Sequence, residues 1–204
     1  MILEQELKLV VTDDAVINLS ALSLAHHIVD GEQVTSHLIS TYFDTADLYL
    51  ASQKVGLRMR QSDGIWLQTV KTSGQVQAGL HQREEWEHTL NGAEWDLEKL
   101  KQTPLAPIIE NAAIWSKIGP VFTTDFERKT LQLGLEDGTQ IELAYDRGRV
   151  IAGQLSQPIH EIELELKSGD VRHLSDLASL LQQQVALTPS DISKAKMGYQ
   201  LIKK

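Results

Sequence analysis

The sequence predicts a mainly β protein of the α+β class, in which eight strands close into a barrel with helices around it. Eight segments carry strand signals, and two connections, at 62–64 (Ser-Asp-Gly) and 136–139 (Glu-Asp-Gly-Thr), have hairpin turn chemistry. Closing such a sheet leaves no unpaired edge and creates an interior that side chains or a ligand must fill. We therefore expect one barrel with helices between the strands and after them.

The N-terminal half is expected to contain five strands and two helices. The strands are predicted at 2–11, 38–43, 55–61, 65–71 and 82–90. Asp13 and Asp14 precede residues 15–27, whose apolar positions have helical spacing, so a capped helix is predicted there. A short helix is predicted at 46–53, and residues 74–79 are expected to form a flexible connection.

The C-terminal half is expected to begin with helices and then to form three long strands. Residues 96–116 have a helical pattern, and Pro104 and Pro107 should separate two short helices. The strands are predicted at 121–135, 140–150 and 158–167. An amphipathic helix at 171–185 and a last helix from Ser190 to Tyr199 follow. No linker or repeat divides the chain, so a single domain, 1–204, is expected.

Composition places the chain in the ordinary globular class and excludes several kinds of site. Hydrophobic residues make up 42% and charged residues 23% of the 204 residues, and no apolar run approaches the ~20 residues of a membrane-spanning helix. The N-terminus lacks the features of a secretory signal, so a cytoplasmic location is expected. There are no cysteines, which excludes disulfides and thiolate metal sites. The net charge of −9 argues against nonspecific binding to nucleic acid or an anionic membrane, but not against a buried basic cluster.

Charged residues occupy every second position of three predicted strands, and therefore one face of each. The three stripes are Glu4, Glu6 and Lys8; Arg58 and Arg60; and Glu161, Glu163 and Glu165. A single stripe could be the solvated face of an edge strand. Three glutamates spaced ~6–7 Å apart, however, repel one another, and a divalent cation would convert that repulsion into attraction. Mg²⁺ and Mn²⁺ prefer such carboxylate oxygens.

Basic residues on the strands could bind a polyanion. Arg58 and Arg60 share a face, Lys71 follows on the next strand, and guanidinium groups bind phosphate oxygens in bidentate fashion. Further candidates, each of which alone could be a surface charge, are Arg83, Glu85, Arg128 and Lys194. Glu142 and Asp146 share parity on one strand and could extend an acidic wall. Together the stripes predict a metal-dependent enzyme that acts on a phosphate chain.

The sequence gives less support to other kinds of active site. Residues 74–79 have the first spacing of a phosphate-binding loop, but Leu80 and His81 stand where Lys and Ser or Thr are required. No nucleophile elbow or dinucleotide fingerprint is present. The histidines are interpreted as packing or surface residues: His26, His27, His81, His88, His160 and His173. The tryptophans are interpreted as core or cavity-rim residues: Trp66, Trp86, Trp95 and Trp115.

Seven short motifs along the chain resemble those of the CYTH superfamily, also called triphosphate tunnel metalloenzymes. They are E-x-E-x-K at 4–8, YFDT at 42–45, LRMR at 57–60, LHQR-x-E at 80–85, TDF-x-R at 124–128, E-x-E-x-E at 161–165 and SKA at 193–195, with Lys71 between the third and the fourth. The chain looks most like bacterial inorganic triphosphatases. In some of these a helical CHAD domain follows, which is not expected within these residues.

The resemblance implies an eight-stranded antiparallel barrel that forms a tunnel. Carried over by motif, the residues that bind phosphate oxygens would be Lys8, Arg58, Arg60, Lys71, Arg83, Arg128 and Lys194. Those that hold metal would be Glu4, Glu6, Asp146, Glu161, Glu163 and Glu165. The catalytic set is expected to comprise Glu4, Glu6, Lys8, Arg58, Arg60, Glu163 and Glu165. Glu161 could instead point at the tunnel mouth, and Glu142 could orient an arginine or a water.

The function implied by the resemblance is hydrolysis of tripolyphosphate to pyrophosphate and phosphate. A water activated by one of two Mg²⁺ or Mn²⁺ ions would attack the terminal phosphorus in line. The alternatives are an adenylate cyclase, a nucleoside or thiamine triphosphatase, and a non-catalytic polyphosphate- or nucleotide-binding module. Gly56 stands where thiamine triphosphatases of the superfamily have a tryptophan, and Trp66 or Trp86 could contribute to a base-recognising entrance. The oligomeric state is left open.

Overall fold

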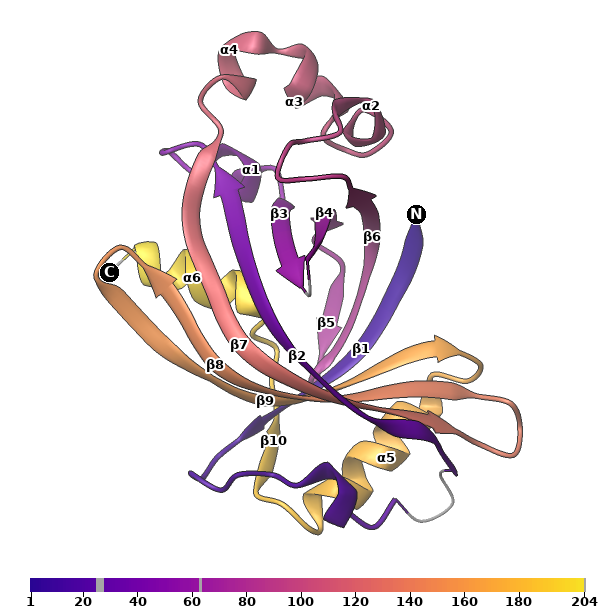
Figure 1. The fold of residues 1–204 in the computed structure, drawn as a ribbon. Helices are drawn as coiled ribbons and strands as arrows, with labels where there is room; N and C mark the ends of the chain where they lie inside the picture. Colours follow the sequence, from indigo (N-terminus) through magenta and orange to yellow (C-terminus); the bar gives the residue numbers. More distant parts are fainter. Residues whose placement is uncertain (25–27, 63, 204) are drawn as a thin grey trace.

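The computed structural model, which describes residues 1–24, 28–62 and 64–203, contains a closed antiparallel β-barrel (Figure 1). The strand order is β10-β1-β9-β8-β7-β2-β3-β4-β6-β5, and β1 also pairs with β6 and so closes the ring. Within the described residues the ring has eight strands: β1 (Ile2–Val11), β2 (Ile28–Asp44), β3 (Val55–Ser62), β4 (Ile65–Thr72), β6 (Leu80–Leu90), β7 (Gly119–Gly134), β8 (Gln140–Ala152) and β9 (Leu155–Ser168). The predicted barrel is confirmed.

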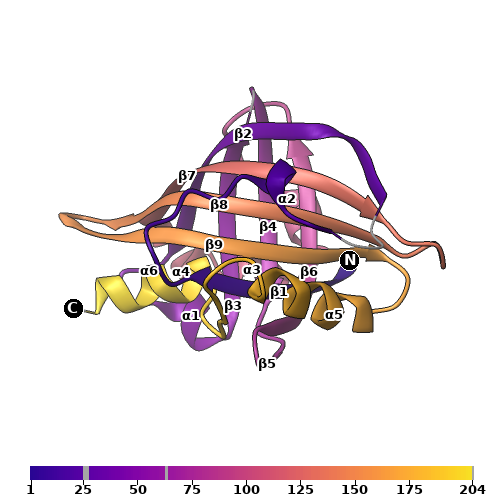
Figure 2. The same ribbon diagram turned by 90° about the horizontal axis from the view of Figure 1, so that it is seen from below.

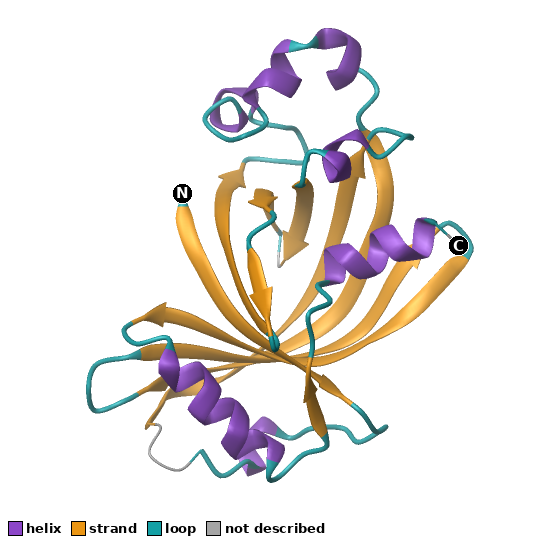
Figure 3. Ribbon diagram, turned by 180° about the vertical axis from the view of Figure 1, so that it is seen from behind, coloured by secondary structure: helices purple, strands orange, loops and turns teal. Residues whose placement is uncertain are grey.

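The helices lie at the two ends of the barrel and along one wall (Figure 3). Over one end lie α2 (Leu97–Leu100), α3 (Ala106–Glu110) and α4 (Ala112–Trp115), and α1 (Tyr49–Ser52) packs near them. The other end carries α5 (Arg172–Gln182), which contacts β1 and β9 (Figure 2), whereas α6 (Lys194–Ile202) packs against β7, β8 and β9. Among the described residues, no helix is both long and apolar enough to cross a membrane.

Two large apolar clusters among the described residues lie outside the ring. Leu7 and Leu9 of β1 pack with α5 in one cluster, and Leu57 and Val70 pack with α1, α2 and α3 in another. A third cluster joins Phe126 and its neighbours to α6. Because strand residues alternate between faces, apolar residues that pack outward place their charged neighbours inside the barrel. The fold therefore leaves a polar interior.

The helix predicted at 15–27 is wrong over the part that the structure describes. Only Leu19–Ala21 forms a 3₁₀ turn, and residues 25–27, with His26 and His27, lie outside the described residues. The Asn18 side chain accepts a hydrogen bond from the Ser20 backbone N–H at 3.2 Å, so it begins a short turn where the pattern predicted helix interior. Ile17 and Leu19 are nevertheless buried. Apolar residues of this segment therefore pack on the core without forming an α-helix.

Three further elements differ from the prediction. β2 is much longer than 38–43, because its polar N-terminal part pairs with β7 and backbone pairing does not depend on apolar side chains. α1 is shorter than 46–53 and begins after Leu48, whose φ is 58°. The predicted loop 74–79 contains β5 (Gln75–Gln77), which pairs with β6. Gly74 permits this close approach, since a Cβ there would lie 1.7 Å from the Gln82 carbonyl oxygen.

The structure of the C-terminal half agrees more closely with the prediction. β7, β8, β9 and α5 are confirmed to within a few residues at each end. Residues 96–116 form three helices and not two, because the Asn111 side chain caps α4 by accepting from the Ala113 N–H at 3.2 Å. The last helix begins at Lys194 and not at Ser190, with Ser193 as its N-cap. Before it lies an unpredicted strand, β10 (Leu187–Pro189), which pairs with β1.

Candidate active site

The charged residues of β1 lie inside the barrel. Glu4, Glu6 and Lys8 are only 7%, 5% and 1% exposed, whereas Leu7 and Leu9 pack outward in the cluster beside α5. A solvated edge face would leave these charges in water, so that interpretation is wrong. Buried charges are costly unless they are paired and hydrogen-bonded. The barrel interior must therefore supply their partners.

Lys8 and Lys194 bring three carboxylates together beneath the cavity. Lys8 Nζ lies 3.0 Å from Glu161 Oε1 and also contacts Glu163. Lys194 Nζ lies 2.6 Å from Asp146 Oδ2 and 2.9 Å from Glu163 Oε1, and it contacts Glu161 as well. One ligand oxygen of each carboxylate lies within 4.8 Å of the others. The final helix thus delivers Lys194 to acids that β8 and β9 present.

Arg128 of β7 completes this cluster. Its Nε and Nη2 donate to the two carboxylate oxygens of Asp146 at 2.7 and 2.6 Å, and Nη2 also contacts Glu163. Strand register explains the arrangement, because Arg128 pairs with Asp146 and Asp146 pairs with Glu161. The inner charge cluster therefore balances three cations against three carboxylates: Lys8, Arg128, Lys194, Asp146, Glu161 and Glu163.

The ion pairs of the inner charge cluster outweigh the effect of burial on its pKa values. Burial alone would raise the pKa of Glu163, but Lys194, Lys8 and Arg128 hold it well below the usual carboxyl range. Burial alone would lower the pKa of Lys8, yet Glu161, Glu163 and Glu6 keep it well above its ordinary value. Both groups are therefore charged at neutral pH.

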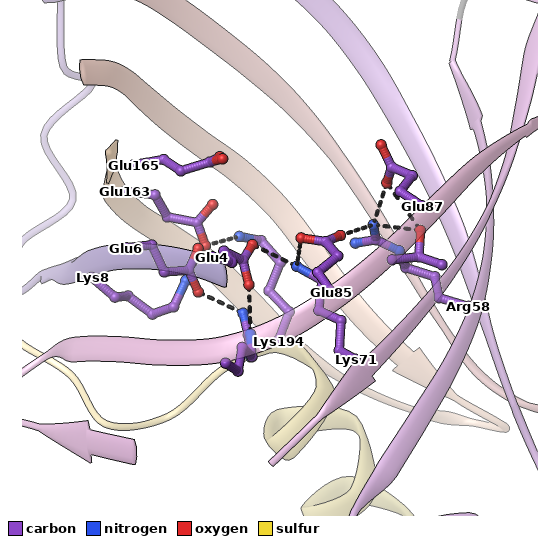
Figure 4. Close-up of polar contacts among 12 residues, drawn as sticks. Glu4, Glu6, Lys8, Arg58, Lys71, Glu85, Glu87, Glu163, Glu165 and Lys194 are labelled. Carbon is purple, nitrogen blue, oxygen red and sulfur yellow. Dashed lines mark hydrogen bonds and ion pairs between the residues drawn. The ribbon is translucent and has the colours of Figure 1, made fainter. Parts of the chain in front are cut away.

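A second chain of ion pairs crosses from β1 to β6 and β4 (Figure 4). Arg83 bridges two acids of β1, with Nε 2.6 Å from Glu4 Oε2 and Nη2 2.6 Å from Glu6 Oε1. Lys71 Nζ lies 2.6 Å from Glu4 Oε1 and 3.1 Å from Glu85 Oε2. Burial raises the pKa of Glu4, but Lys71 and Arg83 hold it well below its usual range. Positive and negative groups therefore alternate across the interior.

The far end of this chain is a basic wall on β3. Arg58 Nη2 lies 3.0 Å from Thr69 Oγ1 and 3.2 Å from Glu87 Oε2. Arg60 Nε donates to Ser40 Oγ at 2.9 Å, and no carboxylate in the described part of the chain forms an ion pair with it. Burial, followed by repulsion from Arg58 and Arg128, lowers the pKa of Arg60 to about 10. Arg60 is thus a partly buried cation without an ion-pair partner in the described part of the chain.

A further group of carboxylates, the outer acidic group, extends across β1, β8 and β9; it comprises Glu4, Glu6, Glu142 and Glu165. Glu165 pairs in register with Glu6 on one side and with Glu142 on the other. Its side chain is 30% exposed and its carboxylate contacts Lys167 at 2.8 Å. Burial raises the pKa of Glu165, Lys167 opposes that shift, and Glu4 and Glu142 add to it. Negative charge is therefore in excess here.

These groups surround one cavity of about 880 Å³. The cavity wall includes most of the residues predicted from the stripes: Glu4, Glu6, Lys8, Arg58, Arg60, Lys71, Arg83, Arg128, Glu163, Glu165 and Lys194. Asp146 and Glu161, 0% and 2% exposed, lie instead behind the cations that contact them. Trp86 packs outside the barrel against the cluster beside α1, which does not support its predicted place at the entrance.

Residues 3–199 of this chain match the CYTH domain. The chain belongs to the CYTH family. An inorganic triphosphatase from Haemophilus influenzae is 39% identical to this chain over an alignment 208 residues long. The alignment covers 98% of this chain and 55% of that protein. The CYTH chain thus spans about half the length of this curated relative.

Solved structures share the fold of this CYTH chain. A putative adenylyl cyclase from Hippeastrum, described as having a dominant triphosphatase activity, has a TM-score of 0.64 and 19% identity over 97% of this chain and 95% of that one. A putative adenylate cyclase from Vibrio parahaemolyticus has a TM-score of 0.51 and 18% identity over 98% and 97%. At these identities the likeness shows the fold alone.

The acidic groups of the CYTH chain suit the divalent metal that its family implies. Every candidate ligand is a carboxylate oxygen, and the sequence has no cysteine to favour a softer metal. In the inner charge cluster, however, the three tightly grouped carboxylates are already balanced by Lys8, Arg128 and Lys194. In the outer acidic group Arg83 and Lys71 contact Glu4 and Glu6, but Glu165 and Glu142 share a single half-exposed lysine. Because Glu165 and Glu142 are the less neutralised carboxylates, the outer acidic group fits an exchangeable metal ion better than the inner charge cluster does.

Sequence reasoning missed several residues of the CYTH site. Glu85 was only a weak candidate, and Glu87 was not considered, although both share parity with Arg83 on β6. The 2%-exposed His81 lines the cavity, and its Nε2 lies 2.9 Å from the carbonyl oxygen of Ser190, in the segment that leads to α6 and Lys194. Strand parity could have found all three, because each is an even number of residues from Arg83.

Proposed function

We propose that this CYTH chain is a metal-dependent inorganic triphosphatase, which hydrolyses tripolyphosphate to pyrophosphate and phosphate inside the barrel. The observation that carries the proposal is the charge imbalance of the basic wall, where the partly buried Arg60 has no ion pair with a carboxylate among the described residues. A partly buried cation without a paired anion, on the wall of a cavity, favours a ligand that supplies negative charge. The Haemophilus relative, named an inorganic triphosphatase, supports a triphosphate as that ligand.

The cations would exchange carboxylate partners for phosphate oxygens when the substrate enters. The proposed phosphate-binding residues are Lys8, Arg58, Arg60, Lys71, Arg83, Arg128 and Lys194. They come from β1, β3, β4, β6, β7 and α6, so together they can contact a chain of phosphates from several sides. Arginine pairs would stabilise the charge that develops on the transferring group and on the pyrophosphate leaving group.

The acids would hold the metal and orient the water. The proposed ligands are Glu4, Glu6, Asp146, Glu161, Glu163 and Glu165, with Glu165 and Glu6 of the outer acidic group as the first to be tested. Bound Mg²⁺ or Mn²⁺ supplies positive charge to the phosphate oxygens and lowers the pKa of a water. Asp146 and Glu161, which lie behind the cavity wall, hold Lys8, Arg128 and Lys194 in position. A second ion, at the inner charge cluster, would require a lysine to leave.

A phosphate-release assay tests the proposal. Tripolyphosphate, ATP and thiamine triphosphate are compared with Mg²⁺ and with Mn²⁺, and the ATP reaction is also analysed for cyclic AMP. We expect tripolyphosphate to have the highest kcat/KM and cyclic AMP to be absent. Preferred hydrolysis of ATP, or formation of cyclic AMP, would contradict the proposed substrate. Binding of tripolyphosphate without release of phosphate would instead support a non-catalytic module.

A further inference from the structure

Lys167 occupies a position on β9 that none of the proposed roles uses. It continues the inward face of that strand two residues after Glu165. Its Nζ lies 2.8 Å from Glu165 Oε1 and 3.7 Å from Glu142 Oε1. Throughout the described ranges, no other basic side chain forms an ion pair with either carboxylate. Lys167 is thus the counter-ion of one end of the outer acidic group.

The exposure of Lys167 distinguishes it from the two lysines of the inner charge cluster. Its side chain is 39% exposed, whereas those of Lys8 and Lys194 are 1% and 8% exposed. A buried ammonium cannot leave its carboxylates without a large desolvation penalty, but a half-exposed one can exchange them for water at little cost. Lysine also has a flexible four-carbon stem. Among these three lysines, Lys167 is the one that can release its partners.

The backbone just after Lys167 is anchored, although the register of β9 against β8 shifts at Lys167 itself. The Asp170 N–H donates to Thr139 Oγ1 at 3.1 Å, directly after β9. Gly169, with φ of +100°, packs so closely that a Cβ would lie 2.3 Å from the same oxygen. The end of β9 is therefore held against the β7–β8 turn.

We propose that Lys167 is an internal counter-ion that competes with the divalent metal for Glu165 and Glu142. Its ammonium neutralises this end of the outer acidic group until an ion binds, and it then moves into solvent. A divalent cation brings two charges where the ammonium brings one, so the exchange is favourable but weaker than binding to an empty acidic group. Lys167 would therefore lower the metal affinity and keep the ion exchangeable. This inference rests on the metal dependence in the proposed function.

A Mn²⁺ titration without any triphosphate tests this role, with free Mn²⁺ followed by electron paramagnetic resonance. Lys167→Met removes the charge and keeps most of the side-chain volume. The matched control is Lys129→Met, since Lys129 of β7 has the opposite parity to Arg128 and pairs with Glu127 at 3.3 Å. We expect Lys167→Met to bind Mn²⁺ roughly tenfold more tightly, after allowance for solvent screening. Lys129→Met should have wild-type affinity, and Lys167→Arg, which keeps the charge, should remain near it.

The other outcomes separate this inference from the proposed function. Unchanged or weaker Mn²⁺ binding by Lys167→Met would overturn the inference. A raised KM for tripolyphosphate with unchanged Mn²⁺ affinity would also overturn it, and would make Lys167 a phosphate contact. If no variant binds Mn²⁺, the inference and the metal site fail together. Tighter Mn²⁺ binding by Lys167→Met in a protein that releases no phosphate would support the inference and contradict the proposed function alone.

Discussion

Replacement of Lys8 by methionine should destabilise the protein strongly at neutral pH. Lys8 is 1% exposed and contacts Glu161 and Glu163; Lys194 contacts both carboxylates as well, and Arg128 contacts Glu163. The inner charge cluster has three cations and three carboxylates, so the variant retains one buried negative charge in excess. Removing one partner of a buried ion pair typically costs about 3–5 kcal/mol. Methionine fills much of the lost volume, so we expect a loss of this size from charge alone.

Urea unfolding, followed by tryptophan fluorescence, measures this loss. A second substitution provides the test of cause: Glu161→Gln in the Lys8→Met background removes the excess charge and should recover part of the stability. Lys101→Met is the control, because Lys101 pairs with Glu98 at 2.7 Å on the surface, and its midpoint should equal that of wild type. A loss below about 1 kcal/mol for Lys8→Met, or no recovery in the double variant, would refute the reasoning.

The pH dependence of the loss gives an independent check. In the wild type, Lys194, Lys8 and Arg128 outweigh burial and hold the pKa of Glu163 well below its ordinary value of 4.5. Such a carboxylate contributes stability that is present above pH 4.5 and is lost as the pH falls through the folded-state pKa. Lys8→Met removes part of that contribution. The difference in the free energy of unfolding between wild type and variant should therefore be largest near neutral pH and should decrease on acidification. A difference that grows below pH 4.5 would contradict the ion pair between Lys8 and Glu163 as its cause.

Three other predictions concern activity. Arg60→Met should raise the KM for tripolyphosphate roughly tenfold or more. It should not lower the urea midpoint, because Arg60 has no ion-pair partner among the described residues. A lowered midpoint with an unchanged KM would contradict the role of Arg60 in substrate binding. Glu165→Gln should reduce phosphate release by roughly 100-fold or more in a folded protein, with a smaller effect for Glu142→Gln, and full activity would exclude Glu165 as a ligand. EDTA should abolish phosphate release, and Mg²⁺ or Mn²⁺ should restore it; activity that persists in EDTA would contradict metal dependence.

Much of the sequence interpretation depended on strand parity. The predictions from parity were correct where residues of one strand share a face. Glu4, Glu6 and Lys8 lie inside the barrel together, as the period of two required. The same rule supports Glu85, which was already a candidate, and would have added Glu87, because both share parity with Arg83. The periodic pattern at 15–27 misled, because apolar residues of an irregular segment can pack on a core at helical spacing.

Other features of the fold had no signal in the sequence of the segment that forms them. β2 extends far beyond its apolar part because its neighbour β7 offers backbone partners. The division of 96–116 into three helices follows from the side chain of Asn111, which begins a new helix instead of continuing the old one. In both cases hydrogen bonding by polar groups decided the element, and apolar periodicity does not record it.

The sequence alone determined the barrel, the inward stripes of charge and the family resemblance, because the alternation of side chains along a strand is a local property. It could not determine which charges neutralise one another. Lys8 and Glu161 are 153 residues apart, and only the register of β1 against β9, together with the placement of α6, brings them and Lys194 into one cluster. Tertiary structure likewise decided that Arg60 lacks a carboxylate among the described residues and that Lys167 stands at the excess acid of Glu165. Ion pairing depends on distances of a few ångströms between strands, and no pattern within one strand contains them.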